Sequence, residues 1–213
     1  LIGRQTNSVG VLTLDGGLFN HTNASQNVAL AYGGGRGELN ITGGTLNSPG
    51  RSLSTGQYNL YGATGIVNLC AGTLAVNTIT NLPSLGVAVV NFSGGTLKAC
   101  TNAPQFMTKD LTYVNVNGPF GAYAGGAVID SDGKNVTISA PLLAPTGNGV
   151  RTIALATKGS GYIGEPYVSI AGGGGFGATA VANMEEDGSG TYRVASVTVT
   201  SPGWDYASEP AVA

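Results

Sequence analysis

The chain has 213 residues, of which 9% are charged, 42% are hydrophobic and 36 are glycine. Its net charge of −2 offers no basic surface, which argues against nucleic acid as a partner. No apolar run approaches the ~20 residues of a membrane-spanning helix, so we expect no membrane insertion of this segment. Low charge with many glycines can indicate disorder, but here apolar and polar residues alternate, which favours ordered β-structure.

Residues 1–9 precede the first regular pattern and are expected to form an incomplete coil or a cap. A glycine-centred motif then occurs four times in succession. Its second glycine lies at Gly17, Gly44, Gly72 and Gly95, giving intervals of 27, 28 and 23 residues. A repeat with a period in the twenties is typical of a solenoid, in which stacked coils bury one another's apolar sides. We therefore predict an all-β fold, a parallel β-solenoid of roughly four turns between residues 11 and 100.

Stacking the four copies predicts three inward-facing columns of large apolar residues. The columns are Leu12, Leu39, Val67 and Val90; Leu14, Ile41, Leu69 and Phe92; and Phe19, Leu46, Leu74 and Leu97. A polar residue separates the first two columns in every copy: Thr13, Asn40, Asn68 and Asn91. Because side chains alternate along a strand, we expect this polar column to face outward.

Weaker patterns surround these copies. We expect second-face strands near residues 28–32 and 57–61 and a corner at residues 81–86, where a proline follows a leucine. Residues 103–111 are the one stretch where a helical turn or lateral loop is expected. A strand at 111–116, a weak fifth coil at 125–130 that ends in a turn at 130–133, and a strand at 135–139 follow.

In this order, residues 93–99 (SGGTLKA), 106–108 (FMT), 125–130 (GGAVID) and 135–143 (NVTISAPLL) resemble the autotransporter-associated β-strand repeat family. The resemblance covers roughly residues 10–145. It implies a right-handed parallel β-helix, carried by a large exported bacterial surface protein and therefore located outside the cell or on its surface. The next stretch of the family pattern, Lys-x-Gly-x-Gly-x-Leu-x-Leu, is represented here by residues 158–162 (KGSGY) alone.

The last third has a different repeat. Residues 150–159 align with residues 194–203, and Tyr162 and Pro166 align with Tyr206 and Pro210, which gives a period of 44 residues. This pattern resembles glycine-tyrosine-proline repeats of phage tail and bacterial surface proteins. Strands near 178–184 and 191–200 are expected to form a hairpin around residues 185–190. We therefore divide the chain into a β-helix segment, 1–147, and a smaller β-rich repeat region, 148–213, truncated within its second copy.

The sequence contains no catalytic cluster. A β-helical polysaccharide lyase or hydrolase needs paired carboxylates or a metal with a basic residue. Asp15 has no acidic counterpart in the other copies, and Asp130 and Asp132 fit a turn better than a calcium loop. We expect His21 to lie in a solvated loop. The run of glycines at 172–175 lacks the lysine and helix of a phosphate-binding loop. We predict no catalytic residue, metal or cofactor.

Three aromatic residues of the last third, Trp204, Tyr167 and Tyr192, are the candidates for ligand contact, because aromatic faces bind sugars and anchor interfaces. Tyr162 and Tyr206 occupy equivalent repeat positions, which indicates a core or turn-bracing role. Cys70 and Cys100 lie at different points on adjacent coils, so isolated thiols and a disulfide are both open.

These patterns favour a non-catalytic structural or adhesive segment of an exported cell-surface or fibre-forming protein. The alternative is a β-helical carbohydrate-active enzyme or a tailspike-like glycan-binding protein. A solenoid exposes backbone hydrogen-bonding groups at its terminal coils, and we expect an open strand edge at one or both ends. The expected partners are further segments of the same polypeptide or identical subunits placed end to end, with cell-surface glycan as a further partner.

Overall fold

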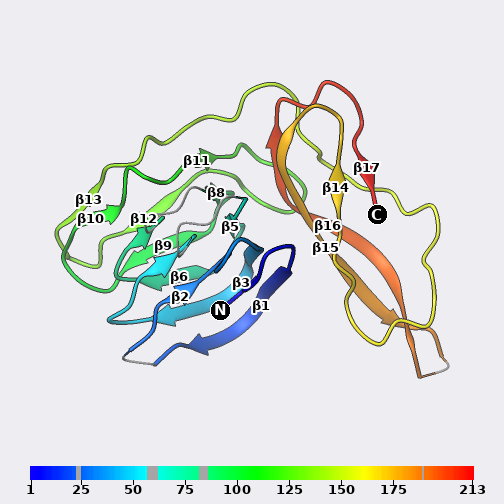
Figure 1. The fold of residues 1–213 in the computed structure, drawn as a ribbon, viewed down its shortest axis with the longest axis horizontal. Helices are drawn as coiled ribbons and strands as arrows, with labels where there is room; N and C mark the ends of the chain where they lie inside the picture. Colours follow the sequence, from blue (N-terminus) through cyan, green and yellow to red (C-terminus); the bar gives the residue numbers. More distant parts are fainter. Residues whose placement is uncertain (23–24, 57–61, 82–85, 189) are drawn as a thin grey trace. The chain divides into compact units, whose positions relative to one another are not determined.

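The structure, a computed structural model, describes residues 1–22, 25–56, 62–81, 86–188 and 190–213, and these residues contain strands and loops but no helix. They divide into two compact units (Figure 1). The first unit comprises Leu1–Pro119 and Tyr123–Ala144, and the second comprises Phe120–Ala122 and Pro145–Ala213. The strand predicted at 57–61 lies outside the described residues, and so does most of the corner predicted at 81–86.

The first unit is a parallel β-solenoid, as predicted. One sheet stacks β11 (Tyr113–Val116), β8 (Val87–Phe92), β5 (Thr64–Leu69), β3 (Arg36–Ser48) and β1 (Val9–Asn20). The second half of β3, beyond the corner, pairs with β6 (Thr73–Val76), which pairs with β9 (Thr96–Ala99), which in turn pairs with β12 (Val128–Asp130). A further sheet contains β13 (Val136–Ile138), β10 (Ala103–Met107), β7 (Ile79–Thr80), β4 (Leu53–Ser54) and β2 (Val28–Ala29). Every strand pair in these sheets is parallel.

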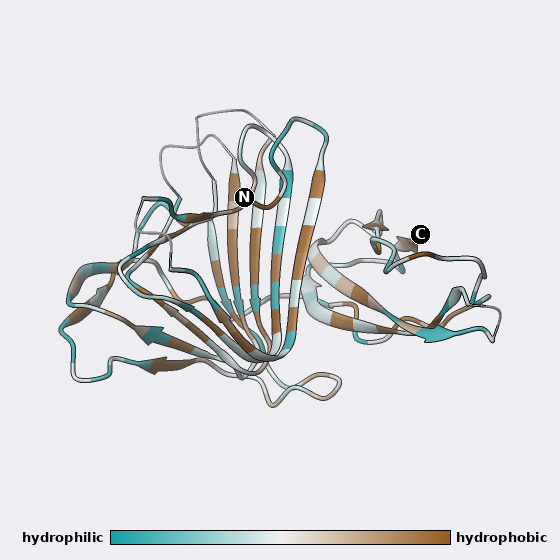
Figure 2. Ribbon diagram, turned by 90° about the horizontal axis from the view of Figure 1, so that it is seen from below, coloured by the Kyte–Doolittle hydropathy of each residue, from teal (hydrophilic) through white to brown (hydrophobic). Residues whose placement is uncertain are grey.

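The predicted register is confirmed in all three apolar columns. Leu12 pairs with Leu39, which pairs with Val67, which pairs with Val90. The other two columns stack in the same way, and the third continues from Leu97 to Ile129. Bands of hydrophobic residues accordingly lie at the same level on neighbouring strands (Figure 2). In the second, third and fourth copies the column residues are fully buried, and they form one continuous core, against which the partly buried Ile129 packs.

Glycine permits the corner between the two halves of each coil. Gly44 and Gly72 have φ of 64° and 62°, in the left-handed region that disfavours residues with a Cβ. A Cβ on Gly72 would also lie 2.5 Å from the carbonyl oxygen of Gly44 in the coil below. In the fourth copy the positive φ falls on Gly94, one residue before the aligned glycine. The glycines therefore allow both the turn and the close stacking of successive turns.

One local prediction is wrong: residues 103–107 form β10 instead of a helical turn or lateral loop. β10 lies between β7 and β13, and Ala103, Phe106 and Met107 are buried in the solenoid core. Burial of these side chains and pairing with both neighbours outweigh the irregular local sequence. The strand at 111–116 and the weak fifth coil are confirmed as β11 and β12.

The second unit is built on an antiparallel hairpin, which confirms the pair of strands expected there. β15 (Phe176–Glu186) pairs with β16 (Tyr192–Trp204), and β14 (Ile170–Ala171) pairs with β17 (Ala211–Val212). A small core lies on this hairpin and contains Val168, Ala180, Ala182 and Val194. The unit therefore has its own hydrophobic cluster, smaller than that of the solenoid.

The period of 44 residues is visible in the backbone of the second unit. Gly159 and its equivalent Gly203 have φ of 63° and 65°, and Gly161 and its equivalent Asp205 have φ of 75° and 58°. The two copies nevertheless differ in pairing. Residues 194–203 lie within β16. Residues 150–158 form backbone hydrogen bonds to β16 at the two ends of this segment, from Val150 N–H to Pro202 and from Val194 N–H to Lys158. Residues 150–158 form no strand, and a hollow of about 350 Å³ is lined by this segment and by residues 195–197 of β16.

We expect Leu69→Ala to destabilise the solenoid by about 2–5 kcal/mol, because it leaves a cavity in a fully packed column. Far-UV circular dichroism during urea denaturation measures the effect. Leu18→Ala is the matched control: Leu18 is 63% exposed in the same sheet, and its truncation should cost much less. Equal costs for the two variants would contradict the burial of this column.

Candidate functional site

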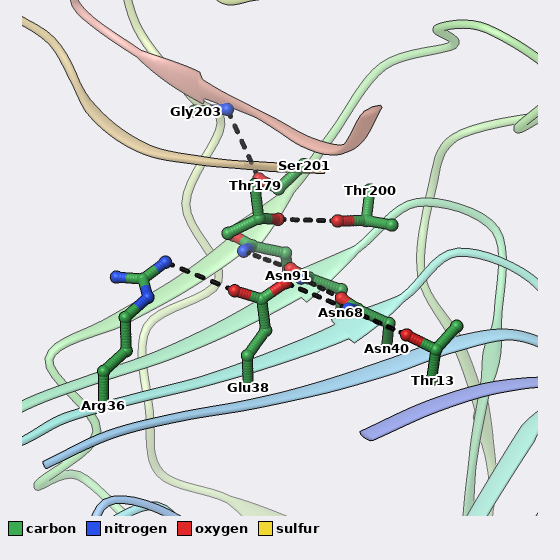
Figure 3. Close-up of polar contacts among 10 residues, drawn as sticks. All are labelled: Thr13, Arg36, Glu38, Asn40, Asn68, Asn91, Thr179, Thr200, Ser201 and Gly203. Carbon is green, nitrogen blue, oxygen red and sulfur yellow. Dashed lines mark hydrogen bonds and ion pairs between the residues drawn. The ribbon is translucent and has the colours of Figure 1, made fainter. Parts of the chain in front are cut away.

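A hydrogen-bonded asparagine ladder runs along the first sheet of the solenoid (Figure 3). The side-chain amide of Asn68 donates to Asn40 at 2.7 Å, that of Asn91 donates to Asn68 at 2.8 Å, and that of Asn115 donates to Asn91 at 2.9 Å. At the lower end, Asn40 lies 3.5 Å from the hydroxyl of Thr13. Each carboxamide thus joins its own coil to the next.

The prediction that this polar column is an outward-facing surface is wrong. The register is as expected, but Asn40, Asn68 and Asn91 are 0% exposed. They alternate with the core residues and so lie on the opposite face of the sheet, yet they are buried there. Burial is tolerated because a carboxamide both donates and accepts, so neighbouring coils satisfy one another's polar groups.

The sequence carried a signal for this ladder. Asparagine occupies the column in three consecutive copies, and Asn115 extends it in the fifth coil. A solvent-facing position accepts many polar residues, whereas a stacked column of one amide type is typical of an asparagine ladder. The identity of the residue, and not only its polarity, was informative.

Glu38 connects to the lower part of the ladder as a buried carboxylate (Figure 3). Its side chain accepts a hydrogen bond from Asn40 at 2.9 Å and forms an ion pair with Arg36 at 3.3 Å. Burial raises the pKa of Glu38 above its ordinary value, although Arg36 and Asn40 act in the opposite direction. Its partners are the Arg36 guanidinium and the Asn40 amide, and neither is the second carboxyl group that glycoside hydrolysis uses.

Asp130 and Asp132 form a turn, as predicted. The Asp130 carboxylate accepts the backbone N–H of Asp132 at 2.8 Å, and Asp132 has a φ of 49°. Lys98 lies 3.5 Å from Asp130 and 3.3 Å from Asp132, and Lys134 also pairs with Asp132. The hydrogen bond from Lys98 is the main reason that the pKa of Asp132 is lowered. The described residues contain no group of three His, Cys, Asp or Glu that could hold a metal ion.

The three aromatic candidates are not gathered on one platform. Trp204 lies at one end of the hairpin, where its ring packs against Phe176 with centroids 5.3 Å apart. Tyr192 lies at the other end of β16, opposite Glu186, roughly 40 Å from Trp204 along the strand. Tyr167 bridges to Val181 in the middle of β15. Tyr167 and Tyr192 are partly exposed, so each could contact a ligand separately.

Tyr206 braces a turn, as its repeat position indicates. It is buried, and its ring lies directly over Gly173 and Gly175, where a Cβ would collide with it. Gly173 also accepts backbone hydrogen bonds from Ala207 and Ser208. The glycine run at 172–175 therefore permits close packing of Tyr206. Tyr162 is half-buried against the small core, and Gly159 makes room for its ring in the same way.

A cleft of about 650 Å³ lies in the second unit between residues 148–154 and residues 206–212. Arg151 and Glu209 are the charged residues of its lining. Its volume is in the range of small-molecule sites, but a lining with one carboxylate and one guanidinium does not provide the acid and base of a glycosidase. The cleft is suited to binding a polar group rather than to acid–base chemistry.

The cysteines and the histidine offer no reactive centre. Cys70 and Cys100 do not form a disulfide, and burial raises the pKa of the Cys70 thiol to about 12, which keeps it protonated. Cys100 is half-buried, and burial also raises its pKa. His21 lies in a loop, as predicted, but it is half-buried and shares a hydrogen bond of 2.9 Å with Ser48, so it is less solvated than expected.

Comparisons of the chain with protein-family models, with curated proteins and with solved structures give no match. Within the described residues, no helix is sufficiently long and apolar to span a membrane.

We expect Asn68→Ala to destabilise the solenoid by about 2–4 kcal/mol, because it leaves a donor of Asn91 and an acceptor of Asn40 buried without their partner. Urea denaturation followed by circular dichroism measures the loss. Asn47→Ala is the matched control, because Asn47 donates to Asn20 in an exposed amide pair on the same sheet. If both substitutions cost the same, burial of the ladder does not contribute to stability.

Glu38 should give the solenoid a pH-dependent stability. Because its pKa is raised in the folded state, its contribution is fully present below the unfolded pKa and is lost as pH rises through the folded pKa. Glu38→Gln stays neutral, so its stability relative to the natural protein should increase between about pH 4 and pH 7. Denaturation midpoints of both proteins over this range measure the difference, in which the other titrating groups cancel. Parallel pH profiles would show that Glu38 titrates normally.

Proposed function

We propose that this chain is a structural or adhesive repeat segment of an exported bacterial cell-surface or fibre-forming protein, and that it is not a catalyst. The observation that carries the proposal is the asparagine ladder above a continuous apolar core. The polar groups that recur in every coil are used to join coils, with donor–acceptor distances of 2.7–2.9 Å. A repeated unit that bonds mainly to its neighbours serves length and stiffness.

The surface location rests on the resemblance to the autotransporter-associated β-strand repeat family. The low charge and the solenoid fold agree with such a role, in which a rod displays loops at its corners. The partners we propose are further segments of the same polypeptide or identical subunits end to end. Cell-surface glycan is a further proposed partner, with Trp204, Tyr167 and Tyr192 as separate contact points.

Catalysis is disfavoured by where the acidic residues lie. Glu38 is buried with Arg36, Asp132 is paired with two lysines, and Glu185 is paired with Lys158 at 2.9 Å and Arg193 at 2.7 Å. The hydrogen bond from Lys158 is the largest cause of the lowered pKa of Glu185, which favours a permanently charged carboxylate over a general acid.

The two parts of the proposal are tested separately. Release of reducing or unsaturated sugar ends from a panel of polysaccharides should not exceed the buffer rate. Antibodies to residues 1–213 should label intact cells of the encoding organism, and external protease should remove the label. Sugar release that a single Asp→Asn or Glu→Gln substitution abolishes would instead establish the carbohydrate-active enzyme. Labelling that requires permeabilised cells would refute the surface location.

A further inference from the structure

The sequence contains two asparagine–glycine pairs, Asn117 with Gly118 and Asn148 with Gly149. Asparagine is among the chemically labile residues, because the backbone nitrogen of the next residue can attack its side-chain carbonyl carbon. A following glycine has no Cβ to hinder this approach. The attack also needs a mobile side chain and a mobile backbone, so the surroundings of each asparagine decide whether it reacts.

Asn117 is held firmly in the solenoid. It is 3% exposed, and its side-chain amide donates to the hydroxyl of Ser93 at 3.0 Å. Its backbone N–H donates to the carbonyl of Phe92 at 2.8 Å, and its own carbonyl accepts the N–H of Gly126 at 2.8 Å. All three hydrogen bonds restrain Asn117, so the fold protects this pair from cyclisation.

Asn148 lies in a looser environment. It is exposed, in a part of the second unit that forms no strand. Its amide lies 3.4 Å from the carbonyl oxygen of Tyr206, which is long for a hydrogen bond. The Asn148 carbonyl accepts the N–H of Tyr206, but within the described residues the N–H of Gly149 donates no hydrogen bond. The attacking nitrogen is therefore not engaged, and the side chain that it attacks is held weakly.

We propose that Asn148 is a site of spontaneous deamidation. The nitrogen of Gly149 gives up its proton and bonds to Cγ of Asn148, while the Cγ–Nδ2 bond breaks and Nδ2 leaves with a proton as ammonia. The product is a succinimide that joins the two residues. Water then opens it: attack at Cγ gives aspartate, and attack at the former backbone carbonyl gives isoaspartate. The reaction consumes water alone and needs no metal, oxidant or enzyme.

The reaction changes the cleft of the second unit, because Asn148 is part of its lining. Either product adds a carboxylate to a lining in which Arg151 and Glu209 are the charged residues. Isoaspartate also adds a carbon atom to the backbone between Asn148 and Gly149, next to the hydrogen bond that Val150 donates to Pro202. Deamidation at Asn148 is independent of the proposed surface role, which sugar release and surface labelling test.

Peptide mapping by mass spectrometry tests the site on the natural 213-residue chain, aged at physiological temperature and mildly alkaline pH. Trypsin places Asn148 in the peptide of residues 135–151 and Asn117 in that of residues 110–134, so the two pairs are measured separately. Fragment ions locate the mass gain that accompanies replacement of an amide by a carboxyl group. We expect Asn148 to react at least about tenfold faster than Asn117, which must first be released by local opening. Labelling by an isoaspartate methyltransferase should appear in the peptide of residues 135–151.

Asn117 is the matched control within the same chain. In guanidinium chloride the fold no longer restrains either pair, and both should react at comparable rates. Asn148→Gln should keep the circular dichroism spectrum and lose the labelling, because the longer side chain cyclises far more slowly. An Asn148 that stays intact in the folded chain while both pairs react in guanidinium chloride would overturn the proposal. Equal rates for the two pairs in the folded chain, or unchanged labelling of Asn148→Gln, would also overturn it.

Discussion

The fold depends on stacking equivalent positions in register on successive coils. A single coil has one apolar side and cannot bury it alone, so Ile41 and Leu69 are each covered by the equivalent residues of the coils on both sides. The intervals between ladder asparagines are 28, 23 and 24 residues, yet the column never slips. Extra residues must therefore be accommodated between strands, while the strands themselves keep one register.

The asparagine ladder fixes that register more strictly than apolar packing can. A one-residue slip would exchange apolar and polar faces, and it would leave carboxamides buried without partners. Leucine, isoleucine and phenylalanine can replace one another in a column, as Leu14, Ile41 and Phe92 show. A hydrogen bond of 2.7–2.9 Å between amides tolerates far less displacement. Apolar burial supplies most of the stabilisation, and the ladder supplies the specificity.

The regular part of the chain was predictable, and the errors arose where neighbours decide the outcome. Period, alternation and paired glycines are local in sequence, so they gave the strands and their register, including Thr13 with Asn40. Asn40 can be buried because it bonds to Thr13 and Asn68, which are 27 and 28 residues away in sequence. The alternation of polar and apolar residues along one strand does not predict such contacts. Residues 103–107 became a strand because two strands flank them, whereas 150–158 did not, although an equivalent sequence at 194–203 lies in β16.

The candidate site was hardest to predict, because it consists of contacts between coils. Aromatic residues close in sequence, such as Tyr192 and Trp204, lie far apart once the strand is extended. Glu38 is only two positions from Asn40 in sequence. What distinguishes it from an ordinary surface carboxylate is its burial, which the local sequence does not show. Strongly perturbed groups often mark active sites, because catalysis needs unusual pKa values in accessible clefts. Here burial raises the pKa values of Glu38 and Cys70, which are both buried in the solenoid, while Arg151 and Glu209 line the cleft of the second unit. These two deeply buried groups and the cleft therefore belong to different units of the chain.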